Sequence, residues 1–216
     1  MQTKQEIQYA LKFQFITNDY SEISHEEQVK KVLEGGCRWI QLRIKEKSDA
    51  FYIETAKRIK KLCHDNNAVF IINDKVDIAK AIDADGVHLG KSDLSPLEAR
   101  EILGSDKIIG GTANTFEDIE ELSQQKVDYI GLGPFRFTTT KKVLSPVLGL
   151  TGYKEIIDKC IHSGLNTPIV GIGGVKQDDI KPLIGTGLYG VAVSSVLSEA
   201  VDINIQTKKF IQEINN

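Results

Sequence analysis

Short apolar runs alternate with longer amphipathic stretches along most of the chain. The runs have the length of buried strands, and the stretches repeat apolar residues at the spacing of one helix face. The pattern predicts eight strands, near residues 11–17, 37–43, 67–72, 84–89, 107–111, 127–131, 167–171 and 188–193. It predicts helices between and after them, near residues 23–34, 48–65, 75–82, 95–103, 116–124, 150–163, 176–184 and 195–214.

Residues suited to helix ends flank several of the predicted helices. Short polar side chains can cap the first turn of a helix, and glycine commonly ends one. The candidate starts are Ser48 with Asp49, Ser92 to Ser95, Thr115 and Thr151, and the candidate stop is Gly35 with Gly36.

Strands that alternate with helices are expected to be parallel, because a parallel pair needs a crossover connection. Eight such units predict an α/β fold, a single-domain (β/α)₈ barrel of the TIM type. The alternative is an open doubly wound sheet, but no Gly-x-Gly-x-x-Gly follows the first strand. We expect one domain over residues 1–216, with residues 1–10 as an N-terminal extension that covers the bottom of the barrel.

The composition excludes several classes of function. Lysine and arginine (27) nearly balance aspartate and glutamate (30), so the chain has no overall charge that would favour nucleic acid or an anionic membrane. No apolar run reaches the length of a membrane span, and no secretory signal precedes the first strand. The three cysteines lack the spacing of a disulfide framework or a zinc site. We expect a cytoplasmic protein that acts on small molecules; a homo-oligomer is compatible with this sequence.

Polar side chains follow the second predicted strand on one face. The two-residue period of a strand places Gln41, Arg43 and Lys45 together, opposite Leu42 and Ile44. Cations at a barrel mouth are costly to bury unless anions meet them, so the group favours a doubly charged ligand such as pyrophosphate. The alternative is that these cations pair with neighbouring acids.

Two carboxylates follow the third and fourth strands. Asp74 and Asp93 would stand at adjacent strand ends, where they could share Mg²⁺ with water and pyrophosphate oxygens. The alternative for Asp93 is that it caps the helix that follows. His88 lies within a predicted strand, which favours a place in the core over a role as catalytic base.

A second group of candidates is suited to bind phosphate. Residues 128–141 form a strand that breaks into Gly-x-Gly-Pro and ends on Thr138, Thr139, Thr140 and Lys141, an arrangement of donors typical of an anion site, or alternatively of an exposed turn. After the fifth strand Thr112 could donate to a phosphate. Glycines after strand seven and serines after strand eight predict a further phosphate site; they are Gly173, Gly174, Ser194 and Ser195.

Taken together, these segments are similar to the thiamine-phosphate synthase family, and the match runs in order through essentially all eight units. The segments that carry it are Gln41-Leu42-Arg43-Ile44-Lys45, Ile72-Asn73-Asp74, Asp85-Gly86-Val87-His88-Leu89-Gly90 with Asp93, Gly131-Leu132-Gly133-Pro134 with Thr138, Thr140 and Lys141, and Val170-Gly171-Ile172-Gly173-Gly174.

The resemblance implies a (β/α)₈ barrel and an activity that requires Mg²⁺. It implies a reaction that joins 4-amino-2-methyl-5-hydroxymethylpyrimidine diphosphate to 4-methyl-5-(2-hydroxyethyl)thiazole phosphate, giving thiamine phosphate and pyrophosphate. The leaving group would depart ahead of attack by the thiazole nitrogen, so that no side-chain nucleophile is needed. The segment 133–148, the longest connection, would be a lid.

The resemblance also implies a role for each matching residue. Gln41 would contact the pyrimidine, and Asp74 and Asp93 would bind Mg²⁺. The diphosphate would be held by Arg43, Lys45, Asn73, Thr112, Thr138, Thr140 and Lys141, of which Arg43, Lys45 and Lys141 would stabilise the charge of the departing group. The thiazole phosphate would be held by Gly173, Gly174, Ser194 and Ser195.

The chain departs from the family pattern at three places, and two other functions stay open. Lys91 replaces a common glutamine, Asn114 a common histidine, and Arg136-Phe137 an apolar residue and a proline, which puts the contacts to the pyrimidine in doubt. The alternatives are a thiazole tautomerase on a related barrel and a non-catalytic sensor of a phosphate ligand.

Overall fold

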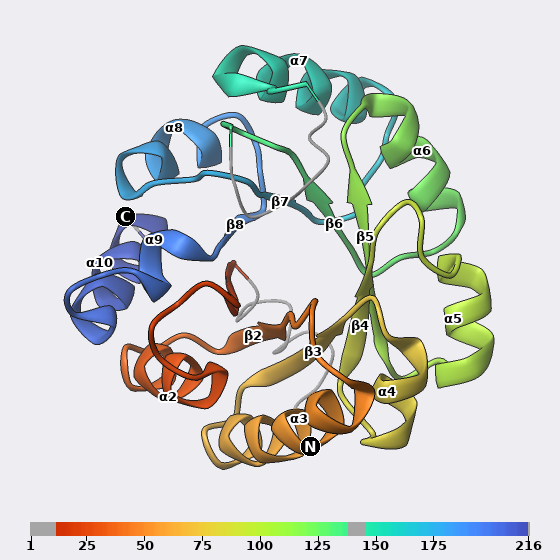
Figure 1. The fold of residues 1–216 in the computed structure, drawn as a ribbon. Helices are drawn as coiled ribbons and strands as arrows, with labels where there is room; N and C mark the ends of the chain where they lie inside the picture. The colour runs from red at the N-terminus through yellow and green to blue at the C-terminus, as the bar shows by residue number, and fades with distance from the viewer. Residues whose placement is uncertain (1–11, 138–145, 216) are drawn as a thin grey trace.

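The strands of the protein form one closed barrel. The structure, a computed structural model, describes residues 12–137 and 146–215, and in it eight parallel strands pair in chain order, with β8 pairing back to β1 (Figure 1). The strands are β1 (Phe13–Ile16), β2 (Trp39–Leu42), β3 (Val69–Asn73), β4 (Gly86–Leu89), β5 (Ile108–Ala113), β6 (Tyr129–Leu132), β7 (Ile169–Gly171) and β8 (Gly190–Val193).

Helices surround the barrel on the outside (Figure 1). They are α2 (His25–Glu34), α3 (Asp49–Asp65), α4 (Val76–Ala81), α5 (Pro96–Leu103), α6 (Phe116–Gln124), α7 (Gly149–His162), the 3₁₀ turn η1 (Gln177–Asp179), α8 (Ile180–Ile184), α9 (Ser195–Ser198) and α10 (Ile203–Asn215). The (β/α)₈ barrel and the eight strands expected from the sequence are confirmed. The expected extension over residues 1–10 lies outside the described residues.

Alternate residues of the strands divide the core into two packed regions. Ile40 and Leu42 of β2 belong to the larger cluster, which lies between the barrel and its helices. Trp39 of the same strand belongs to a smaller cluster with Ile71 and Tyr129, which fills the inside of the barrel. This alternation places side chains such as Gln41 inside the barrel as well, near its carboxyl end.

Capping residues begin the helices at most of the places that the sequence indicates. The hydroxyls of Ser48, Ser95 and Thr115 each accept a hydrogen bond from a backbone N–H in the first turn of α3, α5 and α6. The expectation for Thr151 is wrong, because α7 begins earlier, at Gly149, and Thr151 lies within its first turn. Gly36, with φ of 98°, follows α2 in a conformation that favours glycine.

The single helix expected over residues 195–214 is two helices in the structure. The first, α9, ends at Ser198, and α10 starts at Ile203. Asp202 explains the break, because its Oδ1 accepts a hydrogen bond from the N–H of Ile205 at 2.9 Å and so caps the new helix. The helix expected over residues 176–184 likewise begins as the 3₁₀ turn η1.

The three cysteines, Cys37, Cys63 and Cys160, are free and buried. Burial raises the pKa of Cys37 to about 11, which makes this thiol a poor nucleophile.

Among residues 12–137 and 146–215, no helix has both the length and the apolar character needed to cross a membrane.

The cap of α10 can be tested by substitution. Asp202→Ala removes the side-chain acceptor and should lower the free energy of unfolding by about 1 kcal/mol in chemical denaturation. Asp202→Asn keeps an acceptor at the same place and should lose much less. Equal losses in the two variants would contradict the capping role.

Candidate active site

Two amides from neighbouring strands meet inside the barrel near its carboxyl end. Gln41 of β2 and Asn73 of β3 are both buried, and Gln41 Nε2 donates a hydrogen bond to Asn73 Oδ1 at 2.8 Å. This contact fixes which way the Gln41 amide points. Its other atom, Oε1, is buried and has no hydrogen-bond partner among the described residues. A buried acceptor of this kind is ready for a donor on a ligand.

Next to this pair lies a cluster of one lysine and two acids. Lys45 Nζ pairs with the carboxylate of Asp74, and the side chain of Asp74 is within hydrogen-bonding reach of Asp93. Burial raises the pKa of Asp93, and the neighbouring Asp74 raises it further. The cluster therefore joins the ends of β2, β3 and β4, and it contains the ion pair that was the alternative for Lys45.

The backbone around the two acids explains why they meet. Asp74 has φ of 63°, a left-handed conformation that aspartate tolerates, and its N–H donates to the carbonyl of His88 on β4 at 2.8 Å. Asp93 Oδ2 accepts a hydrogen bond from the N–H of Gly90 at 2.7 Å. The alternative in which Asp93 caps α5 is wrong, because Ser95 provides that cap.

The two acids leave room for other ligands around a cation. Within the described parts of the chain, no group of three or more histidine, cysteine, aspartate and glutamate side chains is arranged to hold a metal ion. Two carboxylates alone suit Mg²⁺, which usually keeps several waters and binds through one or two carboxylates and substrate phosphates. Their role as metal ligands stays a prediction.

Thr112, the candidate on β5, lies inside the barrel and is in contact with His88. The His88 Nε2 and Thr112 Oγ1 atoms are 3.0 Å apart, and both side chains are buried. The expectation that His88 belongs to the core is confirmed.

The glycines after β7 are held against the segment that follows β6. Gly173 and Gly174 have φ of 85° and 73°, and a Cβ on Gly173 would lie 2.8 Å from Pro134 Cβ. The N–H of Arg136 donates to the carbonyl of Gly173 at 2.9 Å. Only glycine fits this close, left-handed backbone.

Two serines follow β8, as the sequence indicates. Ser194 comes directly after the strand, and Ser195 begins the short helix α9. Ser194 Oγ is buried without a hydrogen-bond partner among the described residues. As for Gln41, a ligand would complete this group.

Arg43 is half-buried just beyond β2, and its backbone is hydrogen-bonded to Thr17, the residue that follows β1. Its N–H donates to Thr17 Oγ1 at 3.0 Å, and the Thr17 hydroxyl lies 3.3 Å from the Arg43 carbonyl oxygen. Three other candidates, Thr138, Thr140 and Lys141, lie outside the described residues, as does much of the expected lid. The two described ends of that segment are joined, because Leu148 N–H donates to the Pro134 carbonyl at 3.0 Å.

Three of the residues that depart from the family pattern contact neighbouring segments of the chain. Lys91 Nζ pairs with Asp118 at 2.6 Å, and the Asn114 amide donates to the carbonyl of Gly133. Arg136 forms a two-point ion pair with Asp179, with Nη2 to Oδ1 at 2.6 Å. These contacts give Lys91, Asn114 and Arg136 a structural role, whereas the Phe137 side chain is exposed.

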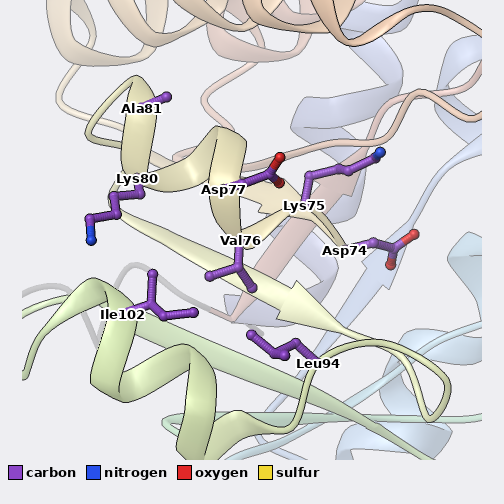
Figure 2. A pocket seen from close by; sticks show the side chains of 8 residues that line it. All are labelled: Asp74, Lys75, Val76, Asp77, Lys80, Ala81, Leu94 and Ile102. Carbon is purple, nitrogen blue, oxygen red and sulfur yellow. The ribbon is translucent and has the colours of Figure 1, made fainter.

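A pocket borders the acidic cluster on the outer side of the barrel. Its volume is about 520 Å³, and it lies between α4 and α5. Figure 2 shows Val76, Leu94 and Ile102 around it, while the carboxyl group of Asp74 points away from these apolar side chains. Nothing in the local sequence pattern indicates this pocket, because it depends on how two helices pack.

The fold and the site define a class of protein. A (β/α)₈ barrel whose carboxyl rim joins a lysine, two acids and a glycine turn is typical of enzymes that act on phosphorylated small molecules. Residues 13–197 match the family model described as thiamine monophosphate synthase. The chain belongs to this family, and the function of its named relatives makes it a transferase.

Relatives match over nearly their whole length. A thiamine-phosphate synthase of Bacteroides fragilis is 47% identical over 201 residues, which are 93% of this chain and 98% of the relative. One from Flavobacterium johnsoniae is 46% identical over 94% of each chain. The solved structure of thiamine phosphate pyrophosphorylase from Pyrococcus furiosus is 32% identical, with a TM-score of 0.86, over 97% of this chain and 98% of that one.

The raised pKa of Asp93 predicts a pH-dependent stability. The folded state holds the Asp93 proton more tightly than the unfolded chain does, so the contribution of Asp93 to stability is lost as the pH rises through its folded pKa. In metal-free buffer, Asp93→Asn should therefore raise the Tm relative to the unmodified protein more at pH 7 than at pH 4, as measured by calorimetry.

The exposed Asp106 provides a matched control for this measurement. Asp106→Asn should show no such gain between the two pH values. A difference in Tm for Asp93→Asn that is the same at pH 4 and at pH 7 would contradict the account of Asp93.

Proposed function

We propose that the protein joins 4-amino-2-methyl-5-hydroxymethylpyrimidine diphosphate to 4-methyl-5-(2-hydroxyethyl)thiazole phosphate. The C–O bond between the pyrimidine methylene and the diphosphate breaks, and its electron pair leaves with pyrophosphate. The thiazole nitrogen then forms a C–N bond to the same methylene carbon, which gives thiamine phosphate. The family to which the chain belongs supports the overall reaction, and the site supports the individual roles.

One observation carries the proposal. Gln41 is hydrogen-bonded to Asn73, and Asn73 directly precedes Asp74 in the chain. Asp74 in turn contacts both Lys45 and Asp93. An acceptor for the pyrimidine, a cation for the diphosphate and two acids for a metal are thus side by side. A molecule that has an amino-pyrimidine at one end and a diphosphate at the other matches this order.

Gln41 is the proposed contact to the pyrimidine. Its Nε2 is already engaged by Asn73, and its buried Oε1 has no partner among the described residues, so Oε1 would be the atom that accepts from a ligand. The 4-amino group of the pyrimidine is a donor and would satisfy this atom. The amide would then fix which edge of the ring faces the rim.

Asp74 and Asp93 are the proposed Mg²⁺ ligands. The contact between their carboxyl groups and the raised pKa of Asp93 fit a pair that a divalent cation would relieve. When bound, Mg²⁺ neutralises charge on the diphosphate oxygens. In its absence, Lys45 and the N–H of Gly90 offset part of the repulsion between the acids.

The diphosphate is held, in this proposal, by donors from several strand ends. Lys45 would turn from Asp74 toward the leaving group, and Arg43, Asn73 and Thr112 would donate from the same rim. The sequence adds Thr138, Thr140 and Lys141, which lie outside the described residues. These donors stabilise negative charge as it builds on the departing group, which is the main contribution that side chains make here.

The thiazole phosphate is assigned to the second group of donors. The turn at Gly173 and Gly174 would present backbone N–H groups to the phosphate. The buried Ser194 Oγ, which has no partner among the described residues, fits a phosphate oxygen. Ser195 adjoins it at the start of α9. Binding here would hold the thiazole nitrogen near the pyrimidine methylene and keep water from that carbon.

The proposal is tested by incubating the purified protein with both substrates and Mg²⁺ and measuring thiamine phosphate and pyrophosphate. Equal amounts of the two products, and none after chelation of the metal, are expected. Binding of thiazole phosphate without turnover would favour a sensor instead. Isomerisation of a thiazole phosphate without any pyrimidine substrate would favour a tautomerase.

Lys45 provides a test of charge stabilisation at the rim. Lys45→Ala removes one cation from the departing group and should lower kcat by about 10²-fold. Lys61, which pairs with Asp65 at 2.7 Å on the outer face of α3, provides the matched control. Lys61→Ala should leave kcat near that of the unmodified protein. An unchanged kcat in Lys45→Ala would reject the assigned role.

A further inference from the structure

A line of four polar side chains crosses the inside of the barrel. Gln14 of β1 donates from Nε2 to Tyr129 Oη of β6 at 3.2 Å. Tyr129 Oη lies 2.9 Å from His88 Nδ1, and His88 Nε2 lies 3.0 Å from Thr112 Oγ1. All four side chains are buried, so each of these contacts is made away from bulk water. The line ends at Thr112, a proposed contact to the diphosphate.

The protons in this line can be assigned from donors and acceptors. Burial raises the pKa of Tyr129 far above its usual value, so its hydroxyl keeps its proton. Because Gln14 already donates to Tyr129 Oη, the phenol proton needs an acceptor, and His88 Nδ1 lies at the right distance. A neutral imidazole that accepts at Nδ1 carries its proton on Nε2, from which it donates to Thr112.

The packing around the rings keeps this arrangement in place. A Cβ on Gly110 would lie 2.2 Å from Tyr129 Cζ and 2.6 Å from His88 Nδ1, so this glycine leaves the space that both rings occupy. The Trp39 ring meets Tyr129 edge-on, with centroids 4.7 Å apart. Close packing of this kind restricts the rotation of the Tyr129 and His88 rings and favours the observed geometry.

We propose that Tyr129 and His88 are positioning residues that orient the Thr112 hydroxyl as a donor toward the diphosphate. Since Thr112 Oγ1 accepts from His88, its own O–H is left to donate to a ligand oxygen. A hydroxyl that accepts one hydrogen bond is also a better donor in the next. This inference rests on the proposed function for the identity of the ligand, whereas the direction of the line is a property of the protein without ligand.

The position of the proton on the His88 ring shows in which direction the hydrogen bonds of this line are donated. Nitrogen-15 spectra of the ligand-free protein distinguish the two neutral tautomers, and the His88 signals are those lost in His88→Gln. We expect the proton on Nε2 in the unmodified protein, and loss of this fixed preference in Tyr129→Phe. Tyr153→Phe, which removes another buried phenol that donates to the Leu132 carbonyl, should leave the His88 signals unchanged. A proton on Nδ1, or on both nitrogens, would overturn the proposal.

A double-mutant cycle tests whether the line acts through Thr112. Calorimetric titration with pyrophosphate and Mg²⁺ should show about a threefold to tenfold weaker affinity in Tyr129→Phe, the effect of one misdirected hydrogen bond. In the background of Thr112→Val, Tyr129→Phe should cause no further loss. Thr112→Ser, which keeps the hydroxyl, should retain both the affinity and the effect of Tyr129→Phe.

The outcomes separate this inference from the proposed function. A full loss from Tyr129→Phe in the Thr112→Val background would show that Tyr129 acts elsewhere and would reject the proposal. If Tyr129→Phe does not fold, the tautomer of His88 in the unmodified protein still shows whether His88 donates to Thr112. Absence of thiamine phosphate formation, with the Nε2 tautomer and coupled pyrophosphate binding intact, would overturn the proposed function and leave the orientation of Thr112 standing.

Discussion

The pairing of the first strand with the last is the constraint on which the rest of the structure depends. Phe13 of β1 is in register with Val191 of β8, and Phe15 of β1 with Ile40 of β2. Because all eight strands are parallel, this closure brings every carboxyl end to a single rim. Gln14 and Tyr129 show the result, since they are hydrogen-bonded although 115 positions separate them in the chain. In an open sheet of the same strands, four other strands would separate β1 from β6 and keep these two side chains apart.

The arrangement of polar groups at the rim lowers the stability of the protein without ligand. Two acids lie in contact, a buried amide oxygen of Gln41 lacks a partner, and so does the hydroxyl of Ser194 among the described residues. Each of these features is unfavourable in a folded chain, and stable proteins tolerate them mainly where a ligand completes them. The ion pair of Lys45 with Asp74 compensates part of the cost and is exchangeable, because both side chains are partly open to solvent.

The fold was predictable from the sequence because its signals are local, and much of the site was not. Strand and helix periods, and polar residues just after each strand, lie within short windows of the chain. The break between α9 and α10 was missed because residues 199–202 fit a helical period, and only the bond from Ile205 to Asp202 reveals the cap. The partner of Lys91 was also hidden, since Asp118 reaches it from the first turn of α6. Tyr129 lies within a predicted strand, and a sequence does not show where a buried hydroxyl points. The roles expected for the site residues stay predictions.

The side chains inside the barrel range from apolar in the core to charged at the carboxyl rim. This change in polarity connects the stability of the barrel with its chemistry. Trp39, Ile71 and Val170 form an apolar plug that stabilises the barrel without any polar group to satisfy beyond the indole N–H. Tyr129, which packs against Trp39, and His88 are polar but are hydrogen-bonded to each other, so they can be buried at little cost. Among the described residues of the site, the charged side chains of Lys45, Asp74 and Asp93 lie at the rim, where they are partly open to solvent. A reaction that depends on charge building up on a leaving group needs donors that are already oriented, because reorientation during the reaction would consume the stabilisation they provide. Tyr129 and His88 are hydrogen-bonded between the apolar core and the charged rim. They would hold a donor at the rim in its orientation, although neither residue needs to touch the substrate.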